Sequence, residues 1–524
     1  MTNISIPSPL PWKIANTRTD IFSAIIKASG KYGSNRVAII DGDGTEVPYK
    51  NVLRGGFALG SALSSHLDKG ETVGIMLPTG VGAVVAFCAV LKSGRLPAMM
   101  NFTAGSANLK LAMKAANIKK IVTAHKFISL GNLEPLIEEL EDTAEFIYLE
   151  DVRDNLSLRD KMAGALGPML PALFHRRQNH KKPAVVLFTS GTEGEPKGVV
   201  LSHQNIIANV EQVRSHIGLS ADHDSVFNPL PTFHCFGLTV GAILPMVAGV
   251  KAVFHPTPLQ PREIAGRIAS TKATILLATD TFINQYSRAA SEGDLDSVRL
   301  AVCGAERVKD ETRQMVRRKF NIEILEGYGA TEASPVVAAN SLELNKPGTV
   351  GRLMADMEYD LVSVDGIEEG GKLRIRGPNV MMGYMRSSAP GVIEAAEGGW
   401  HDTGDIVVID EDDCIRIMGR VKRFAKIGGE MVSLAVVENC ASAMWPDDMH
   451  AAASIPDPRK GEQIVLLSTA QEANRADILA WAQSHGVSEL SVPRKVFTVP
   501  TIPVLGTGKV DYGGVNKLVA ELTS

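Results

Sequence analysis

A glycine-rich run between two apolar stretches is the first place in this sequence where the residue types indicate chemistry. The run reads FTSGTEGEPKGVV, from Phe188 to Val200. Its glycines allow neighbouring backbone N–H groups to converge on one point, which forms an anion-binding nest. Its hydroxyl groups add donors, and Lys197 adds a positive charge. These residue types predict a phosphate-binding loop, with a plain surface hairpin as the alternative because the same residues are common in turns.

The segments on either side decide which kind of phosphate site this could be. The apolar run AVVLF precedes the loop, and a second apolar run, Gly198–Leu201, follows it. A helix is expected only after Ser202, a suitable N-cap residue. A Walker loop reads GxxxxGK[ST] and runs directly into a helix. The sequence therefore predicts a loop between two strands and disfavours a P-loop NTPase.

Short apolar segments alternate with amphipathic ones through the first two thirds of the chain, as in an α/β fold with largely parallel, buried sheets. The expected strands are VAII (37–40), TVGIML (72–77), IVTA (121–124), AVVLF (184–188), KAVF (251–254), ATILLA (273–278) and LAVCGA (300–305). A helix is expected over 311–320. Strands become short and closely spaced over about 345–420, which predicts a small β-rich subdomain. A smaller α/β domain is expected over 421–524, after a large domain over 1–420.

Bulk properties narrow the function classes. A chain of 524 residues is longer than a single hydrophobic core usually organises, so at least two domains are expected. Its net charge of −4 and the lack of a basic block argue against nucleic acid as a partner. Five cysteines, far apart and without a CxxC pair, fit a reducing cytosol and neither a disulfide frame nor a zinc site. We expect a cytoplasmic protein, with peripheral contact to the inner face of a membrane left open.

Two apolar runs, 74–91 and 236–250, need to be weighed against a membrane span. Both contain proline, and the second contains several glycines. Each is shorter than the roughly 20 apolar residues that a spanning helix requires. We predict that each forms a buried strand followed by a buried helix.

The glycine loop is one of eight segments that together resemble the adenylate-forming superfamily, which includes acyl-CoA and acyl-carrier-protein ligases, peptide-synthetase adenylation domains and luciferases. The others follow in the order typical of that superfamily, and the resemblance runs from about residue 10 to the end. They are PTFHCFG (231–237), GAE (304–306), EGYGATE (326–332), GPNVMMGY (377–384), WHDTGD (400–405), GRVKR (419–423) and LGTGKVD (505–511). The resemblance implies an enzyme that uses ATP and Mg²⁺ to activate a carboxylate.

The resemblance also implies roles for individual residues. The β- and γ-phosphates of ATP would be held by Thr189, Ser190, Gly191, Thr192, Gly194 and Lys197. Thr331 would bind the α-phosphate, and Glu332 would be the single carboxylate on a largely hydrated Mg²⁺. Adenine would be flanked by Gly304, Ala305, Glu306 and Tyr328.

Asp405 would accept hydrogen bonds from both ribose hydroxyls, and Arg420 would contact the ribose or a phosphate. His234 would lie beside the substrate carboxylate, although a buried core histidine is the alternative.

A mobile C-terminal domain is the other implication of the resemblance. Lys509 would reach from it to bridge the carboxylate and the α-phosphate. Lys422 matches the hinge about which the domain rotates between adenylation and thioester formation. Gly428 and Gly429 would then leave room for a pantetheine arm. Arg423 departs from the acidic or small residue usual at its position, and the sequence gives no reason for it.

The substrate and the thiol acceptor are less well defined. No Asp or Glu occurs from Asn228 to Leu244, where peptide-synthetase domains carry the aspartate that holds an amino group. Amino acids are therefore disfavoured, and the apolar surroundings permit a fatty acid. In finer detail the chain resembles the acyl-[acyl-carrier-protein] synthetase half of bacterial bifunctional 2-acylglycerophosphoethanolamine acyltransferases, a branch that also carries Glu at position 193. No HxxxxD acyltransferase motif is present.

Three readings stay open. The first is a fatty acid ligase that uses acyl carrier protein, with coenzyme A as the alternative acceptor. A carrier protein is acidic and would need a basic dock, for which the sequence offers Lys422, Arg423, Lys426, Arg459, Lys460, Arg494 and Lys495. The second reading is a non-catalytic acyl-adenylate binding protein. The third is a luciferase-like oxidase.

Overall fold

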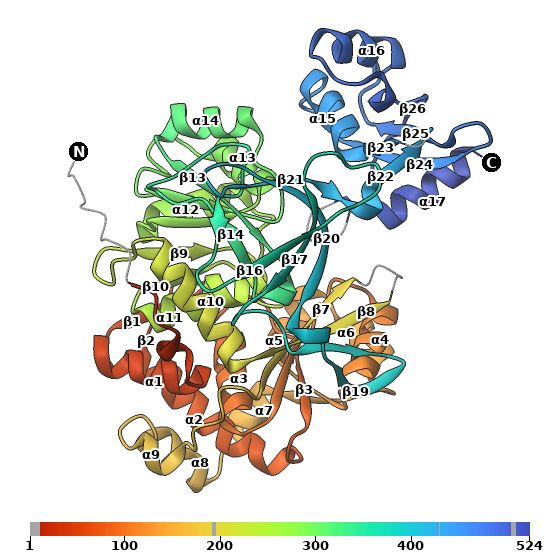
Figure 1. The fold of residues 1–524 in the computed structure, drawn as a ribbon. Coiled ribbons are helices and arrows are strands. Elements are labelled where there is room, and N and C mark those ends of the chain that lie inside the picture. Colours follow the sequence, from red (N-terminus) through yellow and green to blue (C-terminus); the bar gives the residue numbers. More distant parts are fainter. Residues whose placement is uncertain (1–10, 191–194, 429, 505–509, 524) are drawn as a thin grey trace. The chain divides into compact units, whose positions relative to one another are not determined.

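The chain divides into two compact units that are not two consecutive halves. The computed structural model describes residues 11–190, 195–428, 430–504 and 510–523 (Figure 1). The first unit takes in the chain to Met357 and the stretch Arg376–His401, and the second takes in Glu358–Ile375 and Asp402 onward. The domain boundary expected between residues 420 and 421 stays a prediction.

The larger sheet of the first unit has a parallel centre of buried strands. Its middle strands pair in parallel and carry almost only apolar, buried residues, as sheets covered on both faces do. Within the described ranges the sheet has nine strands in the order β15 (Arg352–Leu353), β14 (Val336–Ala339), β13 (Glu323–Gly329), β12 (Leu300–Cys303), β11 (Ile275–Ala278), β9 (Ser225–Asn228), β10 (Lys251–Phe254), β1 (Val37–Ile40) and β2 (Glu46–Pro48).

A second sheet in the same unit contains the two strands on either side of the glycine run. The predicted pair of strands around that run is confirmed as an antiparallel hairpin, with Leu187 opposite Val199 and Thr189 opposite Lys197. In the part of the chain that the structure describes, the sheet has eight strands in the order β19 (Ala389–Glu394), β18 (Gly383–Arg386), β8 (Pro196–Ser202), β7 (Pro183–Ser190), β4 (Leu96–Met99), β3 (Thr72–Ile75), β5 (Lys120–Thr123) and β6 (Glu145–Tyr148).

Helices cover both sheets. The helix predicted after the hairpin begins at its predicted cap, because Ser202 and Asn205 form a reciprocal capping box. Among the described residues the helices of this unit are α1 (Ile21–Tyr32), α2 (Tyr49–His66), α3 (Val81–Lys92), α4 (Ser106–Ala116), α5 (His125–Gly131), α6 (Glu134–Leu140), α7 (Leu149–Asp154), α8 (Leu158–Leu166), α9 (Pro171–Phe174), α10 (His203–His216), α11 (Leu244–Ala248), α12 (Pro261–Thr271), α13 (Asp280–Ala289) and α14 (Asp310–Phe320). The α/β class with layered, mostly parallel sheets is confirmed.

The two apolar runs have different outcomes. The run 74–91 forms the end of β3 followed by α3, as predicted. The run 236–250 does not begin with a strand, so that prediction is wrong. It forms a π-helix (Phe236–Ile243) followed by α11. Among the described helices, none combines the length and the apolar character that crossing a bilayer demands.

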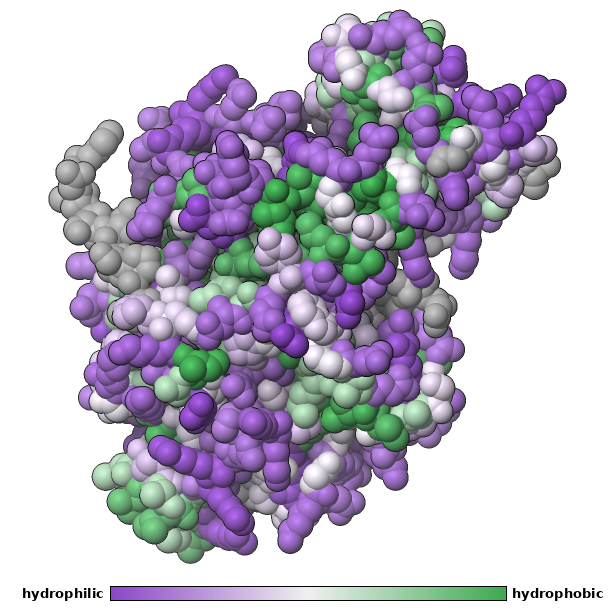
Figure 2. Space-filling model, in the orientation of Figure 1, coloured by the Kyte–Doolittle hydropathy of each residue, from purple (hydrophilic) through white to green (hydrophobic). Residues whose placement is uncertain are grey.

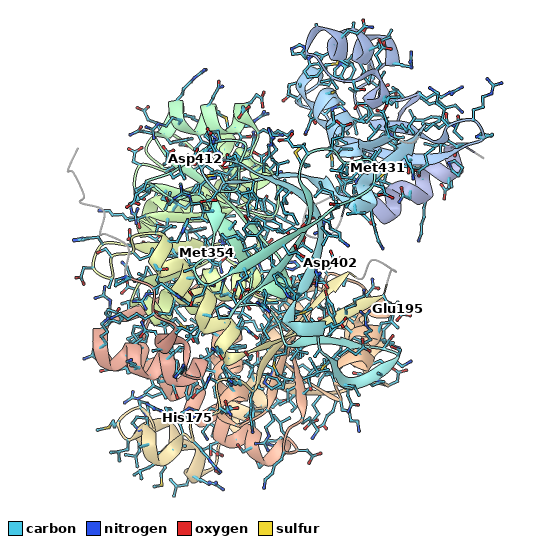
Figure 3. The ribbon with its side chains drawn as sticks, viewed as in Figure 1. His175, Glu195, Met354, Asp402, Asp412 and Met431 are labelled. Atoms are coloured by element: carbon cyan, nitrogen blue, oxygen red, sulfur yellow. The ribbon has the colours of Figure 1, made fainter. Side chains whose placement is uncertain are left out.

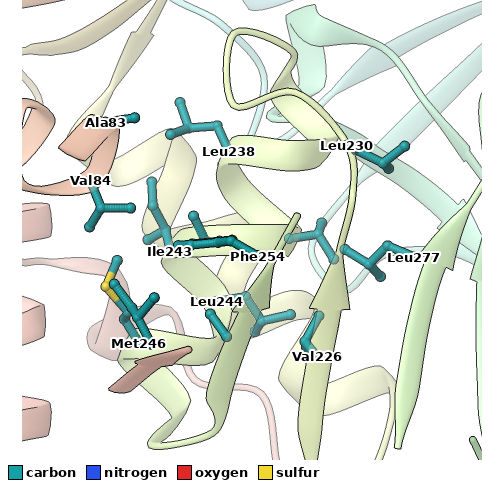
Figure 4. Packing of buried hydrophobic residues seen from close by; sticks show 14 of the residues in the cluster. Ala83, Val84, Val226, Leu230, Leu238, Ile243, Leu244, Met246, Phe254 and Leu277 are labelled. Carbon is teal, nitrogen blue, oxygen red and sulfur yellow. The ribbon is translucent and has the colours of Figure 1, made fainter. Parts of the chain in front are cut away.

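The π-helix depends on contacts that lie outside its own sequence. The Asn228 side chain at the end of β9 donates to the carbonyl of Gly237 at 3.0 Å. A Cβ on Gly241 would lie 2.1 Å from Nδ2 of Asn228, so only glycine allows this approach. Figure 4 shows the apolar side chains that pack around this point, among them Leu238, Phe254 and Leu277. An unbroken apolar run has no period, which explains the wrong prediction.

Among its described residues, the second unit contains two smaller sheets. One has the order β16 (Glu358–Val362), β17 (Gly371–Arg376), β20 (His401–Ile409) and β21 (Ile415–Arg420). The other combines β23 (Glu430–Ser433), β22 (Phe424–Ile427), β25 (Gly461–Ser468), β24 (His450–Asp457) and β26 (Lys495–Thr498) with helices α15 (Leu434–Met444), α16 (Arg475–Ser484) and α17 (Tyr512–Thr523). The α/β sheet and its helices have apolar cores of their own.

Candidate active site

Three of the predicted site segments lie at one edge of the nine-stranded sheet. The segment of His234 follows β9, the turn Gly304–Glu306 follows β12, and the turn of Thr331 and Glu332 follows β13. These strands are parallel and close together in the sheet order. Their carboxyl ends therefore meet at the same edge, where open α/β sheets bind their ligands.

The turn after β12 is held close to the π-helix. A Cβ on Gly304 would lie 3.6 Å from the ring of Phe236, so the two segments are in contact range. Ala305 has φ of +71°, a conformation that is uncommon for a residue with a side chain and is found at functional sites. Glu306 accepts hydrogen bonds from the backbone N–H and the hydroxyl of Thr281, at 3.1 and 2.9 Å. Its carboxylate thus fixes the start of α13.

Glu332 makes the contact that joins the two sheets of this unit. Tyr384, in β18, donates from its hydroxyl to Oε1 of Glu332 at 2.8 Å. Nζ of Lys197, from β8, lies 5.8 Å from the centroid of the Tyr384 ring. Burial, and then the negative charge of Glu332, raise the pKa of Tyr384. The phenol therefore stays protonated and donates to the carboxylate.

The backbone holds these three side chains in place. Tyr384 pairs with Val199 in the ladder between β18 and β8. The N–H of Met381 donates to the carbonyl of Glu332 at 2.7 Å, and the N–H of Met382 donates to that of Val200 at 2.9 Å. One short segment is thus bonded to both the glycine hairpin and the turn of Glu332.

A buried amide network fixes the chain after Glu332. Asn379 donates to the carbonyl of Ala333 at 2.9 Å. Asn209, from α10, donates to the carbonyl of Val336 at 2.8 Å and accepts from its N–H at 3.0 Å. Side-chain amides can satisfy a donor and an acceptor at once, which suits an irregular backbone. Sequence reasoning missed this network, because its members are far apart in the chain.

The segment that carries His234 also carries Cys235, whose pKa is affected by the charge of Glu332. Burial raises the pKa of the Cys235 thiol to about 12, and the charge of Glu332 adds to this effect. His234 is half-buried, and its ring lies 4.8 Å from the ring of Phe233. Both alternatives for His234, a core residue and a substrate contact, remain compatible with this position.

Tyr328 and Thr331 flank the carboxyl end of β13. Tyr328 is buried and pairs with Ala338 of β14 in the ladder. Thr331 is half-buried and begins the short turn that presents Glu332. The predicted stacking of Tyr328 on adenine stays a prediction.

The residues around Glu332 fit a magnesium ion of the kind that keeps most of its water. Among the described residues, no group of three metal-ligating side chains occurs. A half-buried carboxylate with one oxygen held by a phenol can offer its second oxygen to a cation. Mg²⁺ is typically bound by one or two carboxylates together with substrate phosphates.

The second unit contains the other predicted nucleotide contacts. Asp405 lies opposite Arg420 in the ladder between β20 and β21, and Nε of Arg420 donates to Oδ1 of Asp405 at 3.1 Å. Asp405 is buried, whereas the Arg420 side chain is largely exposed. Lys422 is exposed in the short turn after β21, and Gly428 has φ of +63°.

Arg423, which sequence reasoning left without a role, lies in a charged cluster of the second unit. It donates to Oε1 of Glu438 at 2.6 Å and to the carbonyl of Ala452 at 2.7 Å. Its guanidinium carbon lies 3.7 Å from the centroid of the Tyr512 ring. The cluster ties the chain directly after Lys422 to α15, β24 and α17. Arg423 therefore anchors the chain directly after Lys422 to the rest of this part of the unit.

Several predicted residues lie outside the described part of the chain. They are Gly191, Thr192 and Gly194 of the glycine run, Lys509, Gly429, and also Glu193. The backbone of Ser190 pairs with Pro196 at the end of the hairpin, and Thr189 is half-buried. Glu195, labelled in Figure 3, is exposed beside β8. Ser387 donates to its carboxylate.

Comparison with known proteins gives one family and a consistent set of relatives. A family model described as "AMP-binding enzyme" matches residues 26–385. A long-chain-fatty-acid–CoA ligase of Salmonella typhimurium is 26% identical over 480 residues, covering 85% of this chain and 84% of the relative. A mitochondrial medium-chain acyl-CoA ligase of Mus musculus is 27% identical over 491 residues, with 86% and 80% covered.

Solved structures share the fold. ATP-bound MatB of Rhodopseudomonas palustris superposes with a TM-score of 0.82 at 21% identity, covering 97% of this chain and all of the other. An o-succinylbenzoate–CoA synthetase of Bacillus subtilis, in complex with its acyl-adenylate intermediate, gives a TM-score of 0.80 at 19% identity, with 94% and 97% covered.

Replacing Tyr384 tests the contact that joins the sheets. We expect Tyr384→Phe to weaken the Mg²⁺-dependent binding of ATP about tenfold, because a hydrogen bond to a carboxylate is lost. Calorimetric titration with ATP at several Mg²⁺ concentrations measures this. Tyr359→Phe, at an exposed tyrosine, is the matched control. Unchanged affinity at every Mg²⁺ concentration would show that Tyr384 does not position Glu332.

Replacing Arg423 tests the charged cluster. Burial raises the pKa of Glu438, and Arg423 opposes this effect. We expect Arg423→Leu to destabilise the second unit by about 3 kcal/mol, because Glu438 loses its charge partner. Arg423→Leu with Glu438→Leu should recover most of the loss. Urea unfolding followed through the fluorescence of buried Trp445 measures both. A double variant no more stable than the single one would refute the pairing.

Proposed function

Because the chain belongs to the AMP-binding enzyme family, we propose that it is an AMP-forming acid–thiol ligase. In this proposal it activates a fatty acid with ATP and passes the acyl group to a pantetheine thiol. The observation that carries the proposal is the convergence of Lys197, Tyr384 and Glu332 beside the glycine hairpin. A cation and an oriented carboxylate at one place suit the binding of a metal-complexed triphosphate.

The chemical problem is the approach of two anions. An oxygen of the substrate carboxylate attacks the α-phosphorus of ATP, the bond to the bridging oxygen breaks, and pyrophosphate leaves with that oxygen. Mg²⁺ bound at Glu332 would neutralise phosphate charge and orient the triphosphate. Lys197 and the donors Thr189, Ser190, Gly191, Thr192 and Gly194 would hold the β- and γ-phosphates. Thr331 would hold the α-phosphate, and His234 would lie beside the carboxylate.

The nucleoside contacts follow from the same proposal. Gly304, Ala305 and Tyr328 would flank adenine, and Glu306 supports that turn through Thr281. Asp405 would accept from the ribose hydroxyls, and its ion pair with Arg420 orients the carboxylate.

Thioester formation is the second half of the reaction. The thiolate sulfur attacks the acyl carbon of the adenylate, and AMP leaves as its phosphate oxygen takes the bond electrons. We propose that Lys422 is the hinge for the rotation between the halves, since it is exposed and directly precedes the anchored Arg423. Gly428 and Gly429 would admit the pantetheine arm.

The acid is proposed to be a fatty acid. The segment 228–244 carries no charge that could pair with an amino group, and the π-helix within it is buried and apolar. An ammonium ion there would lack a partner, at a cost of several kcal/mol. The two relatives named above are ligases of long-chain and medium-chain acids.

Coenzyme A is the favoured acceptor. The relatives are CoA ligases, and this weighs against the carrier protein that the finer sequence resemblance suggested. Both acceptors present the same pantetheine arm. Two members of the proposed basic dock, Arg423 and Arg494, are engaged with Glu438 and Asp457. This leaves fewer side chains for an acidic carrier protein.

Pyrophosphate release across saturated acids of increasing length tests the activity. We expect acid-dependent release that is greatest with medium or long chains, and AMP-forming thioester synthesis that is faster with CoA than with acyl carrier protein. Glu332→Gln should lower the first step at least about 100-fold, on the scale for losing a charged group in a phosphoryl-transfer site. Release that is independent of any acid, or light emission with oxygen consumption, would overturn the proposal.

Lys509 is tested by separating the two halves. We expect Lys509→Ala to lower adenylation about 10²–10³-fold, the scale for losing one transition-state donor. Thioester formation from a supplied acyl-adenylate should fall far less. Lys517→Ala, at an exposed lysine of α17, is the control. Equal losses in both halves would contradict the role assigned to Lys509.

A further inference from the structure

Helix α8 buries small residues and exposes its large apolar side chains, and Leu173 of the following helix α9 is exposed as well. The face of α8 that packs on α2 is made of Ala163 and Gly164, and Gly167 directly follows the helix. A Cβ on Gly164 would lie 2.9 Å from Cβ of Ala58, and one on Gly167 would lie 2.5 Å from the ring of Phe57. The buried face therefore has to be small, which is the reverse of an ordinary surface helix.

The outward face is a concentrated apolar surface, which we call the α8–α9 patch. It consists of Leu158, Met162, Leu166, Met169, Leu170 and Leu173, whose exposed fractions run from 36% to 77%. The first three are spaced four residues apart and so share one face of α8. Figure 2 shows the patch as the green cluster at the lower left, where Figure 1 labels α8 and α9.

This concentration is unusual on the molecule. The other nine exposed large apolar side chains of the described ranges are spread along the chain from Ile14 to Leu522. Single exposed apolar residues are ordinary, whereas a contiguous patch marks an interaction surface.

Basic side chains border the patch. Within 155–182 the sequence has six Lys or Arg residues and one acid, Asp160, although the whole chain is acidic. Asp160 is buried and takes part in the capping box of α8 with Ser157. The six basic residues are all exposed: Arg159, Lys161, Arg176, Arg177, Lys181 and Lys182.

The patch and its basic border are fixed to the core of the unit. His175, which ends α9 and is labelled in Figure 3, is buried and bonded to Ser23 at 3.1 Å and to Asp20 at 3.3 Å. Burial acts to raise the pKa of Asp20, but the hydrogen bonds from His175 and Ser23 outweigh it and lower that pKa. The N–H of Gln178 also donates to Asp20, at 3.3 Å. The surface is therefore preformed rather than a loose loop.

We propose that the α8–α9 patch docks the protein on the surface of an anionic lipid bilayer. Apolar side chains enter the boundary between headgroups and acyl chains, while the Lys and Arg residues beside them meet lipid phosphates. The exposed charges within 155–182 are all basic, which distinguishes this surface from a self-complementary contact with a second copy, because such a contact would place like charges together. The proposal does not depend on the ligase activity.

Vesicle flotation of the full chain tests the docking. The vesicles contain phosphatidylcholine alone or with about 30 mol % phosphatidylglycerol, at low salt and at about 0.15 M salt. We expect binding to the anionic vesicles that weakens with salt, and little binding to phosphatidylcholine. Leu158→Ser with Met169→Ser and Leu173→Ser should lower the partition coefficient at least about tenfold. Replacing Arg176, Arg177, Lys181 and Lys182 by Gln should do the same.

The matched control changes exposed apolar residues elsewhere in the same unit. Leu130→Ser with Leu259→Ser and Val392→Ser should leave vesicle binding as in the unchanged protein. All variants should keep the unfolding temperature and the ligase activity on a soluble acid, because none of these residues belongs to the proposed site.

Three results would overturn the proposal. The unchanged protein could fail to float with anionic vesicles, or the patch and control variants could float equally. Sedimentation could also show a dimer that only the patch variant breaks, and the occupant would then be a second copy of this chain.

Discussion

One hydrogen bond, from the Tyr384 hydroxyl to the Glu332 carboxylate, joins the two sheets of the first unit at the point where the predicted site segments meet. The neighbouring backbone hydrogen bonds hold the two residues of this contact in place. The pairing of β18 with β8 fixes the position of the Tyr384 backbone, and the N–H of Met381 donates to the carbonyl of Glu332. Lys197 then lies beside the same ring. The carboxylate and the cation are therefore held by contacts within the protein itself, as in sites whose charged groups need little reorganisation during reaction.

In the second unit, the main polar contacts around Arg423 link strands and helices of that unit to one another. Arg423, Glu438 and Tyr512 form one cluster in which each charged or polar group has a partner. The exposed Lys422 lies just before this cluster, and the pair of Asp405 and Arg420 lies just before Lys422. A hinge needs few residues that change and firm attachment on both sides. The contacts of Arg423 explain the arginine at this position as an anchor beside the proposed hinge.

The features predicted correctly from the sequence are those that depend on residues close together in the chain. The strands β1 and β10 were located residue for residue, and the hairpin and the Ser202 cap were found because turn and capping residues act over short distances. The π-helix was missed because it depends on Asn228 packing against Gly237 and Gly241. The role of Tyr384 was missed although its motif was noticed, since its partner lies 52 positions away in the chain. Nothing in the local pattern of 158–173 indicates which face of α8 is buried, and that choice is set by the close approach to α2.

The most direct measurement is a crystal structure with ATP and Mg²⁺ bound. The account predicts the triphosphate against the hairpin of β7 and β8, and a metal ion about 2.1 Å from the free oxygen of Glu332, with Tyr384 still donating to the other. A nucleotide bound away from the carboxyl ends of β9, β12 and β13, or a Glu332 that contacts neither metal nor Tyr384, would contradict it.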